Sequence, residues 1–200
     1  MSTTSFNTLP LLPVLLETLQ GLGFENMTAI QEQSLPLILD GKDLIAQAKT
    51  GSGKTAAFGL GLLQTLDPSK LEPQALVVCP TRELADQVTT ELRRLARQIP
   101  TVRMLTLCGG VPSRPQTESL RNGAHVVVGT PGRIQDHLDR GNLDLSALKT
   151  LVMDEADRMV DMGFKDDMIA IASHCPTRRQ TLLFSATYPD NIRKISARFL

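Results

Sequence analysis

The chain has 200 residues, of which 42% are hydrophobic and 21% are charged. This length supports one sizeable core and is short for two, so we expect a single globular domain over residues 1–200. The formal net charge of +0 excludes a nucleic-acid binder that works through a global positive field, so any such site must be a local patch or a set of backbone donors.

The cysteines, the histidines and the N-terminal region exclude further classes. Cys79, Cys108 and Cys175 are far apart and form no C-x-x-C pair, which argues against a disulfide framework or a zinc site and favours a reducing cytosol. The histidines lack ligand spacing, so we expect them to be structural or exposed. Pro10 and Pro13 interrupt the apolar N-terminal run, and no stretch approaches the ~18 apolar residues of a membrane span. We therefore expect a soluble, cytoplasmic protein.

Short apolar runs predict six strands. In chain order they lie at residues 43–48, 75–79, 104–108, 125–128, 150–153 and 181–184. Most of these runs are nearly continuous, which is typical of strands that are buried on both faces of a parallel sheet.

Helical segments fall between these runs. We expect helices from about residue 54, and over residues 84–99, 116–120, 134–138 and 159–172. The segment at 84–99 is the clearest, because its apolar residues recur every three or four positions and form one stripe. The alternation of strands and helices predicts an α/β doubly wound fold, with a mostly parallel central sheet and helices on both faces.

Each apolar run ends in a small polar or glycine-rich cluster. These clusters occupy residues 49–55, 80–82, 109–110, 130–133, 154–157 and 185–187. Ligands bind beyond the carboxyl ends of the strands in parallel sheets, so the clusters should line one edge of the domain. The sequence therefore predicts one large site at that edge.

The first cluster has the phosphate-loop pattern. Residues 48–55 read AKTGSGKT, with alanine in place of the first glycine. Its glycines let the backbone N–H groups face a phosphate, its lysine suits the β and γ phosphates of ATP or the β phosphate of ADP, and its last hydroxyl suits Mg²⁺. A plain glycine turn is the alternative, but the strand before it and the helix dipole after it favour a nucleotide site. The predicted nucleotide-binding residues of this loop are Ala48, Thr50, Gly51, Ser52, Gly53, Lys54 and Thr55.

Two adjacent acids follow the apolar run at 150–153. Asp154 can hold Mg²⁺ through water, opposite the Thr55 hydroxyl, and Glu155 can orient and deprotonate an attacking water. The alternative is an acid-rich helix N-terminus, which is common. Together with the phosphate loop, the pair predicts Lys54, Asp154 and Glu155 as catalytic residues, and Thr55 and Asp154 as metal ligands.

The motifs, in their order, strongly resemble those of the DEAD-box RNA helicases. They read AKTGSGKT at 48–55, PTRELA at 80–85, GG at 109–110, TPGR at 130–133, DEAD at 154–157 and SAT at 185–187. The resemblance spans nearly the whole chain. It implies a RecA-like phosphate-loop NTPase fold, with residues 1–200 as the N-terminal ATP-binding domain and a Q-motif segment at about residues 4–32. It also implies a second RecA-like domain, which this chain lacks.

The resemblance implies roles that the chemistry alone would not single out. Phe24 would stack on adenine, and Gln31, next to Thr28, would hydrogen-bond the adenine edge and give selectivity for ATP. Three further residues would contact one another and link the nucleotide state to RNA binding. This coupling set comprises Asp157, Ser185 and Thr187. The chain departs from the family at Met27, where a proline is usual.

The resemblance also implies an RNA-binding set, which comprises Pro80, Arg82, Gly109, Gly110, Thr130 and Arg133. Chemistry supports this set, because the glycine pair exposes backbone N–H groups, the threonine offers a hydroxyl ahead of a helix and the arginines add charge. None of these groups reads a base edge, so binding should be independent of sequence and sensitive to salt. The alternatives are a local salt bridge for Arg82 and a simple turn at 130–131.

The function implied by the resemblance is that of a monomeric, RNA-stimulated ATPase that separates short RNA duplexes by closing two domains. Residues 48–64 and 79–97 resemble one bacterial member of the family most, and this finer likeness implies a role in ribosome assembly. Since the second domain would bring the arginine fingers, this chain alone should bind nucleotide, hydrolyse ATP very slowly and not unwind RNA. Two alternatives stay open: a non-catalytic module that regulates partners, and another phosphate-loop enzyme such as a small kinase or a DNA translocase.

Overall fold

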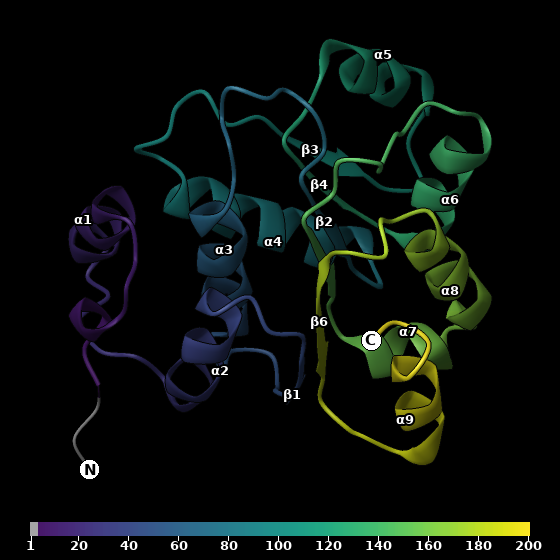
Figure 1. The fold of residues 1–200 in the computed structure, drawn as a ribbon. Helices are drawn as coiled ribbons and strands as arrows, with labels where there is room; N and C mark the ends of the chain where they lie inside the picture. Colours follow the sequence, from purple (N-terminus) through teal and green to yellow (C-terminus); the bar gives the residue numbers. More distant parts are fainter. Residues whose placement is uncertain (1–3) are drawn as a thin grey trace.

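A six-stranded sheet runs through the middle of the molecule in the computed structural model, which describes residues 4–200 (Figure 1). The strands are β1 (Leu44–Gln47), β2 (Ala75–Val78), β3 (Met104–Leu107), β4 (Val126–Gly129), β5 (Thr150–Met153) and β6 (Gln180–Ser185). Their order is β1-β6-β5-β2-β4-β3, and every pairing between them is parallel. All six predicted strands and the parallel sheet are confirmed. The first three residues of the predicted domain lie outside the described part.

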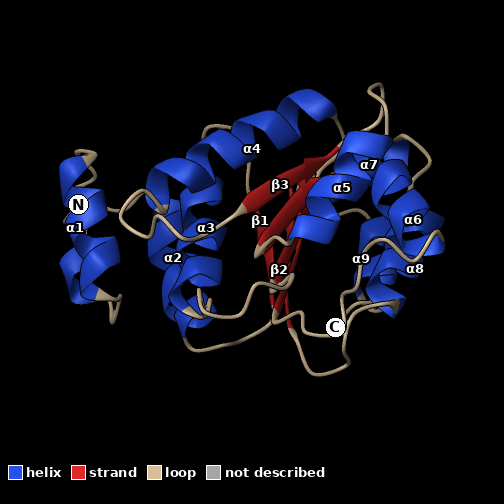
Figure 2. Ribbon diagram, turned by 90° about the horizontal axis from the view of Figure 1, so that it is seen from above, coloured by secondary structure: helices blue, strands red, loops and turns tan. Residues whose placement is uncertain are grey.

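Helices cover both faces of the sheet, as predicted (Figure 2). A short 3₁₀ turn, η1 (Phe6–Thr8), precedes α1 (Pro13–Gly21), α2 (Ala29–Leu39), α3 (Lys54–Gln64) and α4 (Arg82–Leu95). The helices on the opposite face are α5 (Arg114–Asn122), α6 (Pro131–Asp139), α7 (Ala156–Asp161), α8 (Lys165–Ser173) and α9 (Asp190–Ser196). Each layer packs its own hydrophobic cluster against the sheet, so the domain has two cores separated by the strands.

The single helix predicted over 159–172 is wrong. The structure has two helices there, because the chain turns at Gly163, whose φ of 88° lies in the left-handed region that favours glycine. The N–H groups of Gly163 and Phe164 donate to the carbonyls of Val160 and Met159, and so close the end of α7. The helix predicted to reach Ile99 is also shorter than expected. Helix α4 ends at Leu95, and the chain forms a turn after it.

The cysteines and histidines have structural environments. All three cysteines are buried free thiols. His125 and His137 are buried and hydrogen-bonded to neighbouring groups, whereas His174 is exposed, as expected. No helix among residues 4–200 has the length and apolar character needed to cross a membrane.

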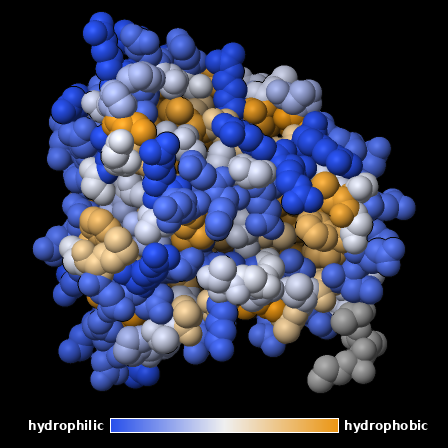
Figure 3. Space-filling model, turned by 180° about the vertical axis from the view of Figure 1, so that it is seen from behind, coloured by the Kyte–Doolittle hydropathy of each residue, from blue (hydrophilic) through white to orange (hydrophobic). Residues whose placement is uncertain are grey.

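The surface carries scattered hydrophobic side chains. Figure 3 shows small apolar patches separated by polar residues on the face turned away from the viewer in Figure 1. The exposed large hydrophobic residues come from different elements and are Leu12, Leu37, Leu71, Met162 and Leu200. Scattered exposure of this kind is ordinary for a globular domain.

Helices α3 and α4 approach closely at Gly59. A Cβ atom at this position would lie 2.7 Å from Cδ2 of Leu92 and 2.9 Å from Cδ1 of Leu95, and both leucines are fully buried. We expect Gly59→Ala to lower the free energy of unfolding by about 1–3 kcal/mol, because the core must shift to admit the methyl group. Urea denaturation measures this change. Gly132→Ala, in α6, is the control, since a Cβ there meets nothing within 4 Å. Equal stability of the two variants would contradict the close-packing argument.

Candidate nucleotide-binding site

The loop between β1 and α3 has the backbone that a phosphate cradle needs. Gly51 and Gly53 have φ values of 83° and 89°, in the left-handed region, and α3 begins at the next residue, Lys54. A Cβ at Gly53 would lie 2.6 Å from Nε2 of Gln31 and 2.8 Å from Oγ1 of Thr28. Glycine is therefore required at position 53 for its conformation and also for the space that it leaves.

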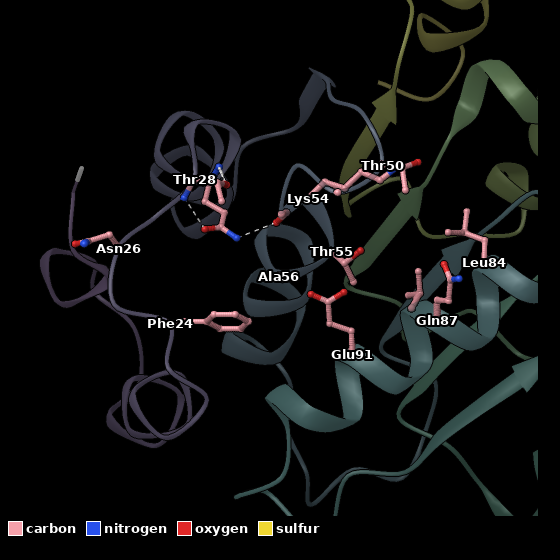
Figure 4. Close-up of a pocket in the computed structure, with 14 residues that line it drawn as sticks. Phe24, Asn26, Thr28, Thr50, Lys54, Thr55, Ala56, Leu84, Gln87 and Glu91 are labelled. Atoms are coloured by element: carbon pink, nitrogen blue, oxygen red, sulfur yellow. Dashed lines mark hydrogen bonds between the residues drawn. The ribbon is translucent and has the colours of Figure 1, made fainter. Parts of the chain in front are cut away.

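A cavity of about 390 Å³ opens beside this loop (Figure 4). Three separate segments line it: the segment before α2, the loop with the start of α3, and one face of α4. The predicted residues among its lining are Phe24, Thr28, Gln31, Thr50, Gly51, Gly53, Lys54 and Thr55. Ala48 and Ser52 are not in the lining. The Ala48 N–H instead donates to the Ser185 carbonyl of β6, at 2.9 Å, which joins the loop to the sheet.

Sequence reasoning missed the part of the lining that comes from α4. Leu84, Gln87, Val88 and Glu91 face the cavity, together with Asn26 and Ala56. The signal that could have identified these four residues of α4 is their helical spacing. Positions 84, 87, 88 and 91 lie three or four residues apart and so share one face of α4. That face was interpreted as core alone, although its polar members lie at the margin of the apolar stripe.

Gln31 ties the segment before α2 to the phosphate loop. Its side-chain Oε1 accepts a hydrogen bond from the Thr28 backbone N–H at 2.9 Å. The backbone N–H of Gln31 donates to the Thr28 hydroxyl at 3.4 Å, and the two bonds form a capping box at the start of α2. Its Nε2 donates to the Gly53 carbonyl at 3.0 Å. A primary amide has two N–H donors and two acceptor lone pairs, so one of each remains for a ligand.

Lys54 and Asp154 form a buried ion pair; Lys54 lines the cavity, whereas Asp154 and Glu155 lie outside its lining. The Lys54 Nζ lies 2.9 Å from Oδ1 of Asp154 and 3.6 Å from Oε2 of Glu155, and Lys54 and Asp154 are almost fully buried. Burial raises the pKa of Asp154 above its ordinary 3.8, while Lys54 opposes the rise. Neither Asp154 oxygen accepts a hydrogen bond of good geometry from residues 4–200. Buried carboxylate oxygens without donors fit the oxygen ligands that Mg²⁺ prefers.

Glu155 has an unusual backbone conformation. Its φ of 54° makes it the one non-glycine residue with positive φ in the described part of the chain. Such a conformation costs on the order of 1–3 kcal/mol and is concentrated at functional sites. The half-buried carboxylate lies 3.6 Å from Lys54 and 3.7 Å from Arg158, so the strained turn holds it beside the phosphate loop.

The three predicted coupling residues contact one another. Oδ2 of Asp157 accepts from the N–H and the hydroxyl of Thr187, at 3.1 and 2.9 Å, and the Asp157 N–H donates to the Ser185 hydroxyl at 3.3 Å. Burial acts against the charged form, but the hydrogen bonds from Thr187, Arg158 and Ser185 prevail and hold the pKa of Asp157 below its ordinary value. These contacts join the turn after β5 to the turn after β6.

The residues predicted to bind RNA lie after β2, β3 and β4, at the same edge of the sheet. Gly109 and Gly110 are exposed, and the Gly109 N–H donates to the Thr130 hydroxyl at 3.3 Å. Pro80 is buried. Arg82 is exposed, with its Nε 3.9 Å from Asp86, so a weak local ion pair is present.

Arg133 is more constrained than the sequence indicated. Its Nη1 donates to the Val111 carbonyl at 2.9 Å and to Oε1 of Gln116 at 3.1 Å. The side chain is half-buried and holds the loop that follows the glycine pair. The guanidinium is therefore already engaged in hydrogen bonds within the domain.

Comparisons with known proteins agree on one family. The DEAD/DEAH box helicase family matches residues 28–195. The chain is 59% identical over 98% of its length to "ATP-dependent RNA helicase DbpA" of Escherichia coli, and 49% identical over 98% to "DEAD-box ATP-dependent RNA helicase CshA" of Geobacillus kaustophilus. It spans 43% and 42% of those two proteins.

A solved structure has the same fold. It is a crystal structure of a DEAD box protein from the hyperthermophile Methanococcus jannaschii, which is 38% identical and superimposes with a TM-score of 0.91. The match covers 98% of this chain and 53% of the other. The predicted RecA-like α/β fold is thereby confirmed.

Proposed function

Because this chain belongs to the DEAD/DEAH box helicase family, we propose that it is the N-terminal, ATP-binding RecA-like domain of an ATP-dependent RNA helicase. One observation carries the proposal: Lys54, which lines the phosphate-loop cavity, forms a buried ion pair with Asp154 and also lies 3.6 Å from Glu155. The loops with exposed N–H groups lie at the same edge of the sheet. Nucleotide and RNA would thus bind to neighbouring loops of one rigid sheet.

ATP hydrolysis uses residues of the phosphate loop and of the turn after β5. The loop N–H groups and Lys54 hold the β and γ phosphates, and Lys54 exchanges its contact with Asp154 for a contact with phosphate. Mg²⁺, held by Thr55 and Asp154, would neutralise charge on the phosphate oxygens. Glu155 accepts a proton from the attacking water. The water oxygen bonds to the γ-phosphorus, and the bond between the γ-phosphorus and the oxygen that bridges to the β-phosphate breaks.

Adenine occupies the end of the cavity near Phe24, which stacks on it, while the free donor and acceptor of Gln31 meet its edge. We expect Gln31→Ala to weaken ATP binding about tenfold and to reduce the preference for ATP over GTP, because the base edge and the Gly53 carbonyl both lose a partner. Calorimetric titration with both nucleotides measures this. Gln20→Ala, at an exposed position of α1 outside the cavity lining, is the control. Unchanged ATP affinity would exclude Gln31 from the site.

RNA is held through its backbone by Arg82, Gly109, Gly110 and Thr130, with Arg133 supporting the loop and Pro80 shaping the turn before α4. Contacts of this kind carry no base information, so binding is salt-sensitive and general. The contacts between Asp157, Ser185 and Thr187 link the catalytic turn to its neighbour. We further propose that the parent protein is a cytoplasmic monomer that acts in ribosome assembly. RNA crosslinking of the full-length protein tests that role, and recovery of messenger RNAs alone would contradict it.

The test of the proposed function is ATP hydrolysis by this chain, with and without a second RecA-like domain, and with RNA, DNA or neither. Turnover that needs both domains and RNA supports the proposal, since a trans-acting arginine contributes about 10³–10⁵ in rate in related enzymes. Nucleotide binding without turnover under any condition favours the non-catalytic regulatory module. Equal stimulation by DNA favours a translocase, because contact to the 2′-hydroxyl distinguishes RNA.

A further inference from the structure

Glu91 is an acid in the nucleotide cavity that the proposed mechanism does not use. It belongs to α4, one turn after Gln87 and Val88, and its half-buried side chain lines the cavity. Figure 4 shows its carboxylate turned toward Thr55, with the Phe24 ring across the cavity from it. The carboxylate therefore faces the region between the start of α3 and the aromatic ring.

The Glu91 carboxylate has no firm partner in the protein. No ion pair within 4 Å and no hydrogen bond of good geometry reaches it from residues 4–200. A carboxylate has about four acceptor sites, so with only the Thr55 hydroxyl beside it this half-buried group can accept further hydrogen bonds from a ligand.

The position of Glu91 identifies the chemistry of that ligand. In a bound nucleotide the ribose connects the base to the phosphates, so it must lie between Phe24 and the loop at 51–55. An anionic carboxylate repels phosphate, but it accepts strong hydrogen bonds from hydroxyl groups. The ribose offers two of them, at its 2′ and 3′ positions, and an acid that binds the ribose 2′-hydroxyl is a recurrent device in dinucleotide-binding folds.

We propose that Glu91 is a specificity-determining residue that accepts hydrogen bonds from the ribose hydroxyls of the bound nucleotide, so that the domain selects ribonucleotides over 2′-deoxynucleotides. The inference rests on the nucleotide site of the proposed function. It gives α4 a part in substrate selection, and Leu84 and Val88 supply the apolar floor on which the sugar would rest.

The test measures dissociation constants of ATP, 2′-deoxy-ATP and 3′-deoxy-ATP, each with Mg²⁺, by calorimetric titration of the whole chain and its variants. The wild-type chain should bind ATP about tenfold or more tightly than 2′-deoxy-ATP, which is the size of a charge-assisted hydrogen bond. Glu91→Leu should bring this ratio close to one, because ATP loses the contacts of both hydroxyls and is weakened more than 2′-deoxy-ATP, which loses only the contact of its 3′-hydroxyl. Glu91→Gln keeps an acceptor and should give an intermediate ratio.

The control is Glu83→Gln, an exposed acid on the same helix outside the cavity lining, which should leave every constant unchanged. Thermal unfolding of each variant checks that it is folded. An unchanged ratio in Glu91→Leu, or equal weakening of all three nucleotides, would overturn the role of Glu91 and point to an effect on Thr55 instead. A wild-type chain that binds no adenine nucleotide would overturn the nucleotide site itself.

Discussion

Glu155→Gln is expected to reduce RNA-stimulated ATP hydrolysis by about 10²–10⁴, measured with the second RecA-like domain present. The amide has the shape of the carboxylate but cannot accept the proton of the attacking water. Binding of ATP should change little, because the phosphate loop and Lys54 stay in place. The effect should therefore appear in kcat, with the nucleotide dissociation constant almost unchanged.

Asp161→Asn is the matched control for this variant. Asp161 is an exposed acid at the last residue of α7, the helix that begins just after Glu155, and it lies outside the cavity lining. Its loss should leave hydrolysis unchanged. Turnover by Glu155→Gln within a few-fold of the wild-type rate would remove Glu155 as the general base.

Lys54→Ala is expected to abolish nucleotide binding and also to destabilise the free domain by about 3–5 kcal/mol at neutral pH. The variant loses the cation that contacts phosphate. It also leaves Asp154 as a buried carboxylate without its ion-pair partner. Nucleotide titration measures the first effect, and urea denaturation measures the second.

The stability loss of Lys54→Ala should depend on pH in a defined direction. Burial raises the folded-state pKa of Asp154 above 3.8, so its protonated form is favoured in the folded domain, and the associated stability is lost as pH rises through that pKa. The charge of Lys54 lowers the pKa of Asp154, so removing Lys54 raises this pKa further and enlarges the loss of stability at neutral pH. The difference in the free energy of unfolding between wild type and variant should be widest near about pH 7, where Asp154 is ionised, and should narrow as the pH falls through the raised pKa of Asp154.

Lys49→Ala is the control for this measurement, since Lys49 lies in the same loop but is exposed and has no ion pair within 4 Å among the described residues. It should cost little stability at either pH. A gap for Lys54→Ala that stays constant between the two pH values would show that the ion pair with Asp154 is not the source of the destabilisation.

The sheet and the phosphate loop were predictable from the sequence for the same physical reason. Continuous apolar runs indicate strands buried on both faces, and parallel strands place all their carboxyl ends at one edge, so the clusters at 49–55 and 154–157 had to meet. Glycines at 51 and 53 predicted the left-handed backbone that the structure has. Local chemistry and topology were sufficient for this part of the site.

The remaining features depend on contacts that a linear pattern does not encode. The break at Gly163 was missed because the apolar spacing of α7 and α8 continues across the turn that separates them. Glu91 and Gln87 were missed because which side of α4 faces a cavity depends on how α3 packs against it. The support that Arg133 gives to its loop depends on Val111 and Gln116, and the sequence offered only its charge.

The order of the strands has a consequence for local opening. The phosphate loop follows β1, which lies at the edge of the sheet and pairs with β6 alone, whereas the two acids follow β5, which is fully buried between β6 and β2. Edge strands open at a lower free energy than central ones, so amide hydrogens of β1 should exchange with solvent faster than those of β5. The phosphate loop is thus attached to the less protected of the two strands, and the acids are attached to the more protected one.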